Sequence, residues 1–303
     1  MINKEMEYHK PVLLEESVDG LNIKPDGVYV DVTFGGGGHS REILSRLGSE
    51  GRLIAFDQDE DALQNKIDDN RFLLINQNFR YLRRFLRFHG YTEVDGILAD
   101  LGVSSHQFDE ATRGFSIRFD GRLDMRMDTS RSLSAYEVVN TYEEKQLATV
   151  FRLYGELRQA PAMARTIVSK RKESPIETTE QLKEVLERFL PPHRKNKILA
   201  QLYQAIRIEV NEELEVLKAF LMQTTQVLCK GGRLSVISYH SLEDRLVKRY
   251  MRDGLFEGQP ERDIYGRVDV PFKRVGRFIT PGKEEIKENN RARSAILRIA
   301  EKI

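Results

Sequence analysis

Short apolar runs alternate with amphipathic stretches along the first third of the chain, and glycine or acidic residues mark most of the changes. The apolar runs are short and rich in β-branched and aliphatic residues, which is typical of buried strands. We expect strands at residues 28–32, 52–56, 72–75 and 94–100, and helices at residues 40–47, 59–66 and 81–88. This alternation predicts an α/β fold made of βαβ units, with a parallel sheet between layers of helices.

The pattern changes beyond about residue 111. Residues 112–128 are rich in Gly, Arg and Asp, and helical periodicity follows at residues 143–157, 160–172 and 179–189. After a break at Pro191 and Pro192, we expect one long helix over residues 199–228 and a further strand over residues 233–238. A strand that returns so late predicts a mainly helical domain inserted into an α/β domain. The expected parts are residues 1–110 and 205–303 for the core and residues 111–204 for the insert.

Composition places the chain among globular proteins and limits what its charge can do. Hydrophobic residues make up 40% of the 303 positions and charged residues 31%, but the formal net charge is only +1. Any attraction to nucleic acid must therefore come from local basic patches. Each candidate patch alone is typical of a solvated helix face. The candidates are residues 80–87, 165–172, 193–197, 245–252 and 291–298.

Cysteine usage and the N-terminal residues favour a cytoplasmic protein without membrane association. The lone Cys229 lies in an apolar stretch and can form neither an internal disulfide nor a Cys/His metal cluster. The first residues lack the apolar region of a signal peptide, and no apolar run approaches the roughly 20 residues that span a bilayer. We expect no metal at His39, which has no ligating neighbours. The sequence does not distinguish a monomer from a homodimer.

A glycine-rich loop follows the first predicted strand. Gly35–Gly38 lie at a strand-to-helix turn, where the backbone can adopt positive φ angles and a ligand can approach closely. The next strand ends at Asp57, roughly 20 residues after the glycines, which is the spacing of an acid that binds ribose hydroxyls. The loop and the acid together predict a nucleoside cofactor site at the carboxyl edge of the sheet.

The loop also distinguishes between cofactors. A dinucleotide fingerprint requires a third glycine at position 40, where this chain has Ser40. S-adenosylmethionine has no pyrophosphate and is therefore favoured, with Asp31 as a candidate partner for its ammonium group. Phe79 is either an adenine contact or a core aromatic residue, and Asp100 either faces the transferred methyl group or belongs to a turn. A nicotinamide-dependent oxidoreductase and a non-catalytic RNA-binding assembly factor are the alternatives.

Several longer strings resemble one family, the bacterial ribosomal RNA small-subunit methyltransferase H family. The resemblance extends over almost the whole chain, and its strings are too long and too unusual in composition to agree by chance. The matching strings are residues 9–14, 31–40, 95–105, 113–116, 123–128, 204–208, 239–245 and 291–294.

The resemblance implies a Rossmann-like class I S-adenosylmethionine-dependent methyltransferase core, with an inserted helical domain that recognises the substrate. It implies methyl transfer to the N4 amine of cytosine 1402 of 16S rRNA within the small ribosomal subunit. Departures from the family pattern occur at Gly36, which is often larger, and at Asn290, where proline is common. The family's cofactor contacts fall here on Gly37, Gly38, His39, Asp57, Phe79, Asp100 and Gln107.

The chemistry of the reaction suggests catalytic residues. The N4 amine of cytosine is a poor nucleophile, so a protein must align it with the methyl group and accept its N–H bonds. Asp100 is placed to do so, although Leu-Gly-Val follows it instead of the two prolines and aromatic residue of many amino-methyltransferases. Tyr239 and His240 would supply a stacking face and polar contacts. The alternative for the segment after them is a helix cap formed by Ser241 and Asp244.

Overall fold

The computed structural model describes residues 11–261, 265 and 268–303, apart from the side chains of residues 105 and 106. Positions 9 and 10 of the first family string lie outside these residues. The chain divides into two compact units. The sheet unit consists of the residues up to Gly102 together with Glu215–Ile303, and the helical unit consists of Val103–Leu214.

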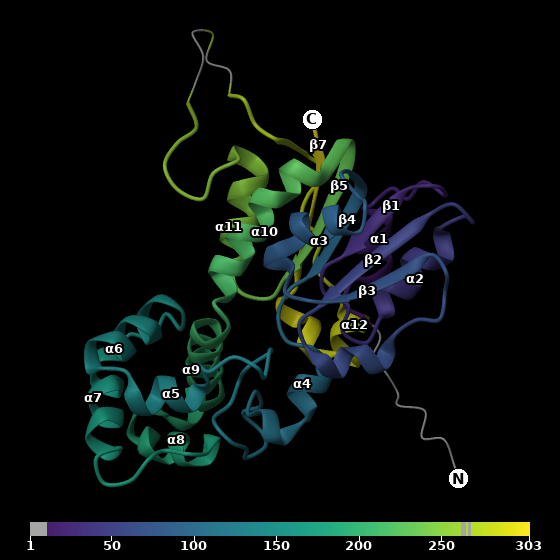
Figure 1. Ribbon diagram of the computed structural model, residues 1–303. Helices are drawn as coiled ribbons and strands as arrows, with labels where there is room; N and C mark the ends of the chain where they lie inside the picture. The colour runs from purple at the N-terminus through teal and green to yellow at the C-terminus, as the bar shows by residue number, and fades with distance from the viewer. Residues whose placement is uncertain (1–10, 262–264, 266–267) are drawn as a thin grey trace, which may run out of the picture. The chain divides into compact units, whose positions relative to one another are not determined.

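Within the described residues, seven strands form one sheet in the order β3-β2-β1-β4-β5-β7-β6 (Figure 1). The first five strands run parallel, whereas β7 is antiparallel to both β5 and β6. Because β4 returns to the opposite side of β1 from β2, the strand order reverses there, where open parallel sheets bind ligands. The strands are β1 (Val28–Asp31), β2 (Arg52–Asp57), β3 (Phe72–Asn76), β4 (Val94–Asp100), β5 (Leu228–Ser238), β6 (Phe272–Arg274) and β7 (Ile296–Lys302).

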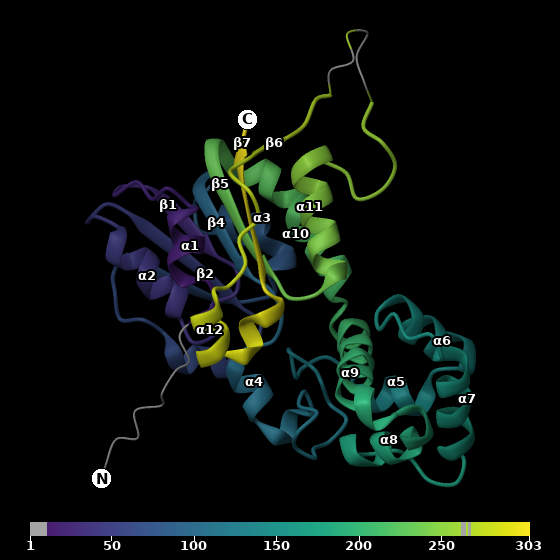
Figure 2. The same cartoon turned by 180° about the vertical axis from the view of Figure 1, so that it is seen from behind.

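Helices cover both faces of the sheet because its central strands bury side chains on two sides (Figure 2). On β2, Leu53 packs into one apolar cluster with α1 (Leu14–Asp19) and α2 (Gly38–Arg46). The next residue, Ile54, points to the opposite face and into another cluster. That cluster holds side chains of α3 (Leu82–Phe88), α10 (Glu213–Val227) and α11 (Ser241–Asp253). Helix α12 (Lys283–Glu288) lies shortly before β7.

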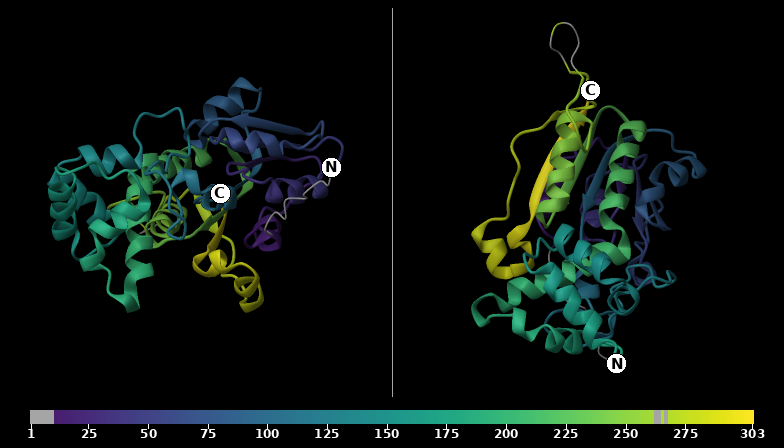
Figure 3. Two further views of the ribbon diagram at one scale, coloured as in Figure 1. Left: turned by 90° about the horizontal axis from the view of Figure 1, so that it is seen from below. Right: turned by 90° about the vertical axis from the view of Figure 1, so that its left-hand side faces the viewer.

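The helical unit has an apolar core of its own, centred on fully buried side chains such as Phe151 and Leu202. In Figure 3 its helices are coloured from blue through teal to green along the chain. The helix α6 packs against both α7 and α9. The helices are α4 (Ser105–Asp109), α5 (Ala135–Thr141), α6 (Glu144–Leu153), α7 (Ala160–Lys170), α8 (Thr179–Val185) and α9 (Lys195–Asn211).

The first four strands are confirmed to within one residue at each end. The prediction of a single helix over 199–228 is wrong, because α9 ends where Glu212 takes a φ of 52°, and α10 begins after it. Residues 59–66 also differ, since they hold the 3₁₀ helix η1 (Glu60–Asn65) in place of an α-helix. The strands β6 and β7 were not expected, because β6 has only three residues and the burial along β7 does not alternate regularly.

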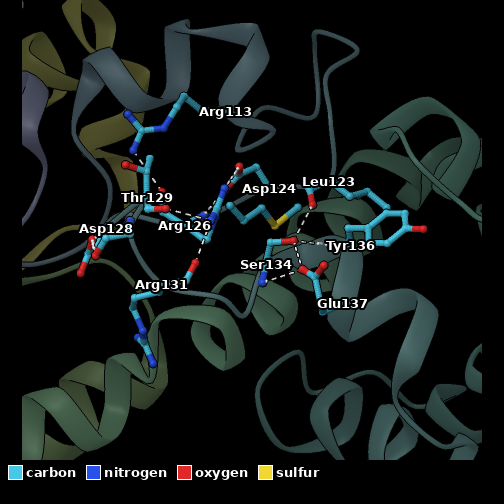
Figure 4. Close-up of polar contacts among 12 residues, drawn as sticks. Arg113, Leu123, Asp124, Arg126, Asp128, Thr129, Arg131, Ser134, Tyr136 and Glu137 are labelled. Atoms are coloured by element: carbon cyan, nitrogen blue, oxygen red, sulfur yellow. Dashed lines mark hydrogen bonds and ion pairs between the residues drawn. The ribbon is translucent and has the colours of Figure 1, made fainter.

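An arginine holds together the loop before α5 in the helical unit (Figure 4). The guanidinium of Arg126 donates to both carboxylate oxygens of Asp124, at 2.8 and 2.7 Å. It also donates to the carbonyl oxygens of Thr129 and Arg131, at 2.8 and 2.7 Å. This planar fork of donors closes the loop around itself, which a lysine could not do.

The same loop is anchored to α9 through the buried side chain of Asn211. Its amide nitrogen donates to the carbonyl oxygen of Met125 at 2.7 Å, and its amide oxygen accepts the N–H of Met127 at 2.8 Å. Met125 adopts a φ of 57°, a conformation that is unfavourable for a side chain of this size. The Asn211 amide therefore binds two backbone groups of a segment that belongs to no helix or strand.

We expect Asn211→Ala to lower the free energy of unfolding by about 2 to 4 kcal/mol, because it leaves a buried N–H and a buried carbonyl without partners. Urea denaturation followed by circular dichroism measures the change. The control is Asn196→Ala, the same substitution at an exposed position of the same helix, which should change stability by less than about 0.5 kcal/mol. Equal effects of the two substitutions would contradict the role given to Asn211.

Candidate active site

The carboxyl ends of the parallel strands bring polar side chains to one edge of the sheet. Asp31 ends β1, Asp57 ends β2, Asn76 ends β3, Asp100 ends β4 and Ser238 ends β5. Parallel register places all of these ends at the same edge. The edge thus gathers residues that are distant in the sequence around the point where the strand order reverses.

The loop between β1 and α2 depends on glycine at defined positions. Gly35 and Gly37 have φ angles of 51° and 77°, in the region that side chains disfavour. Gly38 opens α2, and a Cβ atom on it would overlap the ring of Pro11. The first turn of α2 begins at the carboxyl edge, and the N–H groups of such a turn suit a carboxylate group of a ligand.

Asp57 is tied to the glycine loop. Its Oδ2 accepts the N–H of Gly35 at 2.8 Å, and its Oδ1 accepts the N–H of Asp59 at 2.9 Å. Burial raises the pKa of Asp57 to about 6, although both backbone hydrogen bonds favour the ionised form. A carboxylate has about four acceptor positions, so Asp57 retains capacity for the hydroxyl groups of a ribose.

Asp31 does not occupy the place that the sequence suggests. Its side chain has no exposed surface, and its oxygens accept Ser40 Oγ at 2.7 Å and the N–H of Thr33 at 3.1 Å. A carboxylate buried in this way is not available to the ammonium group of a ligand. It joins the end of β1 to the first turn of α2 instead, and Ser40 stands where a dinucleotide site would have glycine.

Asp100 forms the centre of a second polar group. Tyr239 donates its hydroxyl to Asp100 Oδ1 at 2.7 Å, and His39 Nδ1 lies 3.9 Å from Asp100 Oδ2. Burial raises the pKa of Asp100 to about 6, against the opposing influence of His39 and Tyr239. The N–H of Asp100 donates to Thr33 Oγ1 at 2.7 Å, which links β4 to the loop after β1.

His39 and Tyr239 are both held in their neutral forms beside this carboxylate. Burial lowers the pKa of His39, and its Nε2 lies 3.2 Å from the carbonyl oxygen of Val12. Burial and the neighbouring Asp100 raise the pKa of Tyr239 well above its usual range, so Tyr239 remains a proton donor. Asp100 is therefore the group of the three whose charge changes near neutral pH.

His240 caps the helix that follows β5. It accepts the N–H of Glu243 at its Nδ1, at 3.4 Å, and the carboxylate of Glu243 accepts the N–H groups of Tyr239 and His240 at 2.9 and 3.3 Å. The expected cap by Ser241 is thus displaced by one residue, because the histidine ring takes the role of the usual serine. This box fixes the backbone that carries Tyr239 toward Asp100.

The other two expected cofactor residues, Phe79 and Gln107, make different contacts. Phe79 follows β3 in the 3₁₀ helix η2 (Phe79–Tyr81) and is half-buried, with its ring edge against Phe220 at a centroid distance of 5.3 Å. Gln107 belongs to α4 of the helical unit, where its Oε1 accepts the N–H of Ser104 at 3.1 Å. The sheet unit alone brings together Gly37, Gly38, His39, Asp57, Asp100, Tyr239 and His240.

Sequence reasoning did not identify Thr33 and Glu243 as residues that position the site. Thr33 was part of the loop motif, but its hydroxyl contact with β4 depends on the parallel pairing of β1 and β4. Glu243 stands three residues after His240, and this capping-box spacing could have revealed it had histidine been considered as a cap.

A reversing parallel sheet, a glycine loop after β1, and acids at the ends of β2 and β4 define a Rossmann-like methyltransferase core. The chain belongs to the MraW methylase family, whose model matches residues 6–303. Its cofactor is S-adenosylmethionine, as the sequence predicts, and the glycine cradle with Asp57 fits a nucleoside that bears an amino-acid group.

Relatives of known name agree with this assignment over their whole length. Ribosomal RNA small subunit methyltransferase H of Christiangramia forsetii is 68% identical, covering 98% of this chain and 99% of the relative. The protein of the same name from Bacteroides fragilis is 56% identical over the full length of both. A crystal structure of a rRNA methylase from Streptococcus thermophilus has a TM-score of 0.39 at 14% identity, covering 96% of each chain.

Across the described residues, no helix has both the length and the apolar surface to cross a membrane.

The raised pKa of Asp100 has a consequence for stability. In the unfolded chain this carboxyl has a pKa near 3.8, against about 6 in the folded chain, so the folded state binds the proton more tightly. The stability that this provides is present below pH 4 and is lost as the pH rises through 6. We expect Asp100→Asn to raise the free energy of unfolding by about 3 kcal/mol at pH 8 and to change it little at pH 4.

Urea denaturation at each pH measures the free energy of unfolding. The matched control is Asp95, at the other end of β4. Burial raises its pKa, but hydrogen bonds from Lys24 and from the N–H of Val28 outweigh burial and leave the pKa below its usual value. Asp95→Asn should therefore destabilise the protein at pH 8, and this loss should shrink as the pH falls toward 3. A change of the same sign for both variants at pH 8 would contradict the assignment.

Proposed function

We propose that this protein transfers the methyl group of S-adenosylmethionine to the N4 amine of cytosine 1402 of 16S rRNA in the small ribosomal subunit. The observation that carries the proposal is Asp100, an acceptor with a pKa of about 6 that is oriented by Tyr239 at the edge where the cofactor loop lies. The names of the full-length relatives support ribosomal RNA of the small subunit as the substrate.

In this proposal the cofactor contacts are Gly37, Gly38, His39, Asp57, Phe79, Asp100 and Gln107. The bound cofactor supplies an electrophilic methyl group. The glycine backbone and the first turn of α2 bind its amino-acid part, and Asp57 accepts the hydroxyl groups of its ribose. The ring of Phe79, which lies half-buried just beyond the carboxyl end of β3, provides an apolar face for adenine.

Asp100 acts on the amine. When ionised, Asp100 accepts a hydrogen bond from an N–H group of the cytosine amine. This contact draws electron density onto the nitrogen, whose lone pair is otherwise delocalised into the ring. Tyr239 and His240 complete the proposed catalytic group. The hydroxyl of Tyr239 fixes the carboxylate plane, and the Nε2 of His240 lies 3.1 Å from Oε1 of Glu243.

The loop argues against the two alternative functions. A nicotinamide site would place glycine at position 40, whereas Ser40 here holds the buried Asp31. A non-catalytic RNA-binding factor would not require a glycine loop with positive φ angles or the acid beside it. We further propose that the helical unit recognises the substrate and that the protein works in the cytoplasm, where ribosomal RNA is available to it.

The test is transfer of a labelled methyl group to small subunits from cells that lack the enzyme, with the modified base mapped by mass spectrometry. We expect one methyl group at N4 of the target cytosine. Asp100→Asn should lower the rate by about 100-fold or more, in the range of a lost acid–base contribution. Asp95→Asn, on the same strand but at the opposite edge, should retain most of the rate. A label at another base, or full activity of Asp100→Asn, would refute the proposal.

The pH profile of transfer tests the positioning role of Tyr239. The rate should increase with pH as Asp100 ionises, with an apparent pKa near 6. Because the Tyr239 hydroxyl lowers the pKa of Asp100, Tyr239→Phe should move this limb of the profile to higher pH while leaving the plateau largely intact. A uniform loss of rate at every pH would instead indicate a purely structural role for the tyrosine.

A further inference from the structure

The outer side of α3 carries arginine and aromatic side chains that the methyl-transfer site does not use. Leu82 and Leu86 are fully buried against the sheet, as the helical period requires of its inner side. Arg84 and Arg87 are exposed on the outer side, together with Phe88, which is 79% exposed. Tyr81, just before the helix, is 43% exposed and lies seven residues from Phe88, on the same side.

The positive charge of this surface is not neutralised within the protein. Residues 79–92 contain four arginines and no carboxylate, whereas Arg71 before them is paired with Asp69 at 2.6 Å. Arg83 is bound by neutral partners on α10, donating from its guanidinium to Gln226 at 2.7 Å and from its N–H to Gln223 at 2.9 Å. Among the residues that the structure describes, Arg84 and Arg87 form no ion pair. In a chain of net charge +1, this is a strong local concentration of positive charge.

Aromatic rings alternate with the arginines along the surface. The guanidinium of Arg84 lies 6.0 Å from the ring centre of Phe85, and the ring of Phe88 meets that of His89 edge-on at 5.1 Å. Phosphate groups bind arginines, and unpaired bases stack on exposed aromatic rings. A protein partner would require a broader apolar surface than the isolated rings of Tyr81 and Phe88.

The surface is also continuous with the proposed site. Asn76 ends β3 and donates to the carbonyl oxygen of Asp57 at 3.0 Å, and Phe79 follows at the start of η2. From there α3 leads away from the carboxyl edge beside α10 (Figure 1). Its seven residues extend for about 10 Å at the usual rise of an α-helix. A strand of RNA with one base at the edge could therefore continue along this helix.

We propose that the surface formed by Tyr81, Arg84, Arg87 and Phe88 binds an unpaired segment of RNA next to the methylated nucleotide. The two arginines contact successive phosphate groups, and Phe88 stacks on a flanking base. This inference rests on the proposed function for the identity of the RNA, but the surface itself is separate from the residues that bind the cofactor and the amine.

The experiment measures the affinity of the full-length protein for a fluorescently labelled RNA of the decoding region, by anisotropy at several salt concentrations. Arg84→Ala combined with Arg87→Ala should weaken binding about 10-fold or more. It should also reduce the slope of log K against log salt by about 1.4, since each contact with single-stranded RNA contributes about 0.7. Phe88→Ala should weaken binding about 5- to 100-fold and leave the slope unchanged.

Two controls separate this effect from changes in folding or in the methyl-transfer site. Lys273→Ala combined with Arg274→Ala removes two exposed charges from the edge strand β6 and should leave the affinity nearly unchanged. Arg84→Lys combined with Arg87→Lys should preserve the slope, because the charges remain. Calorimetric binding of S-adenosylhomocysteine should be the same in all of these variants.

Unchanged affinity and unchanged slope in the double alanine variant would overturn the proposal. So would a variant that binds RNA normally but loses binding to vesicles of anionic phospholipid, which would assign the surface to a membrane. If the slope depends on Arg84 and Arg87 but the wild-type protein does not methylate the target cytosine, the RNA surface stands and the proposed function fails.

Discussion

The buried carboxylate of Asp31 is the contact on which the rest of the site depends. It accepts the hydroxyl of Ser40 and the N–H of Thr33, and so fixes the turn between β1 and α2 from inside the protein. Thr33 in turn accepts the N–H of Asp100, which sets the end of β4 relative to that turn. Because the first and fourth strands are neighbours, one buried acid positions both the glycine loop and the proposed acceptor.

The protein maintains charged groups at this edge at a cost in stability. Burial raises the pKa of Asp57 and of Asp100 to about 6, so each loses stability when it ionises near neutral pH. At the opposite edge Asp95, which is paired with Lys24, has a lowered pKa and contributes stability instead. The same residue type thus has opposite energetic effects at the two ends of β4, and only the costly end faces the cofactor loop.

The local distribution of charge indicates more about the partners of this protein than its net charge does. A net charge of +1 argues weakly for any nucleic acid, yet α3 exposes arginines that have no ion pair in the described part of the chain, together with aromatic rings. By contrast, the guanidinium of Arg126 in the helical unit binds only groups of its own loop, namely Asp124 and two carbonyl oxygens. Two arginines of similar appearance in the sequence therefore have different functions, one structural and one available to a ligand.

The sequence by itself determined the parallel sheet, the glycine loop, the position of Asp57 at the end of a strand, and the identity of the family. Strand periodicity, a glycine run and the spacing of an acid are local patterns, which can be recognised without knowledge of tertiary contacts. It could not determine that Asp31 is buried, that His240 rather than Ser241 caps α11, or that a long apolar segment breaks at Glu212. The antiparallel strand β7 was likewise visible only in the fold. These features depend on which strands become neighbours and on which side chains lose water, and tertiary packing alone decides both.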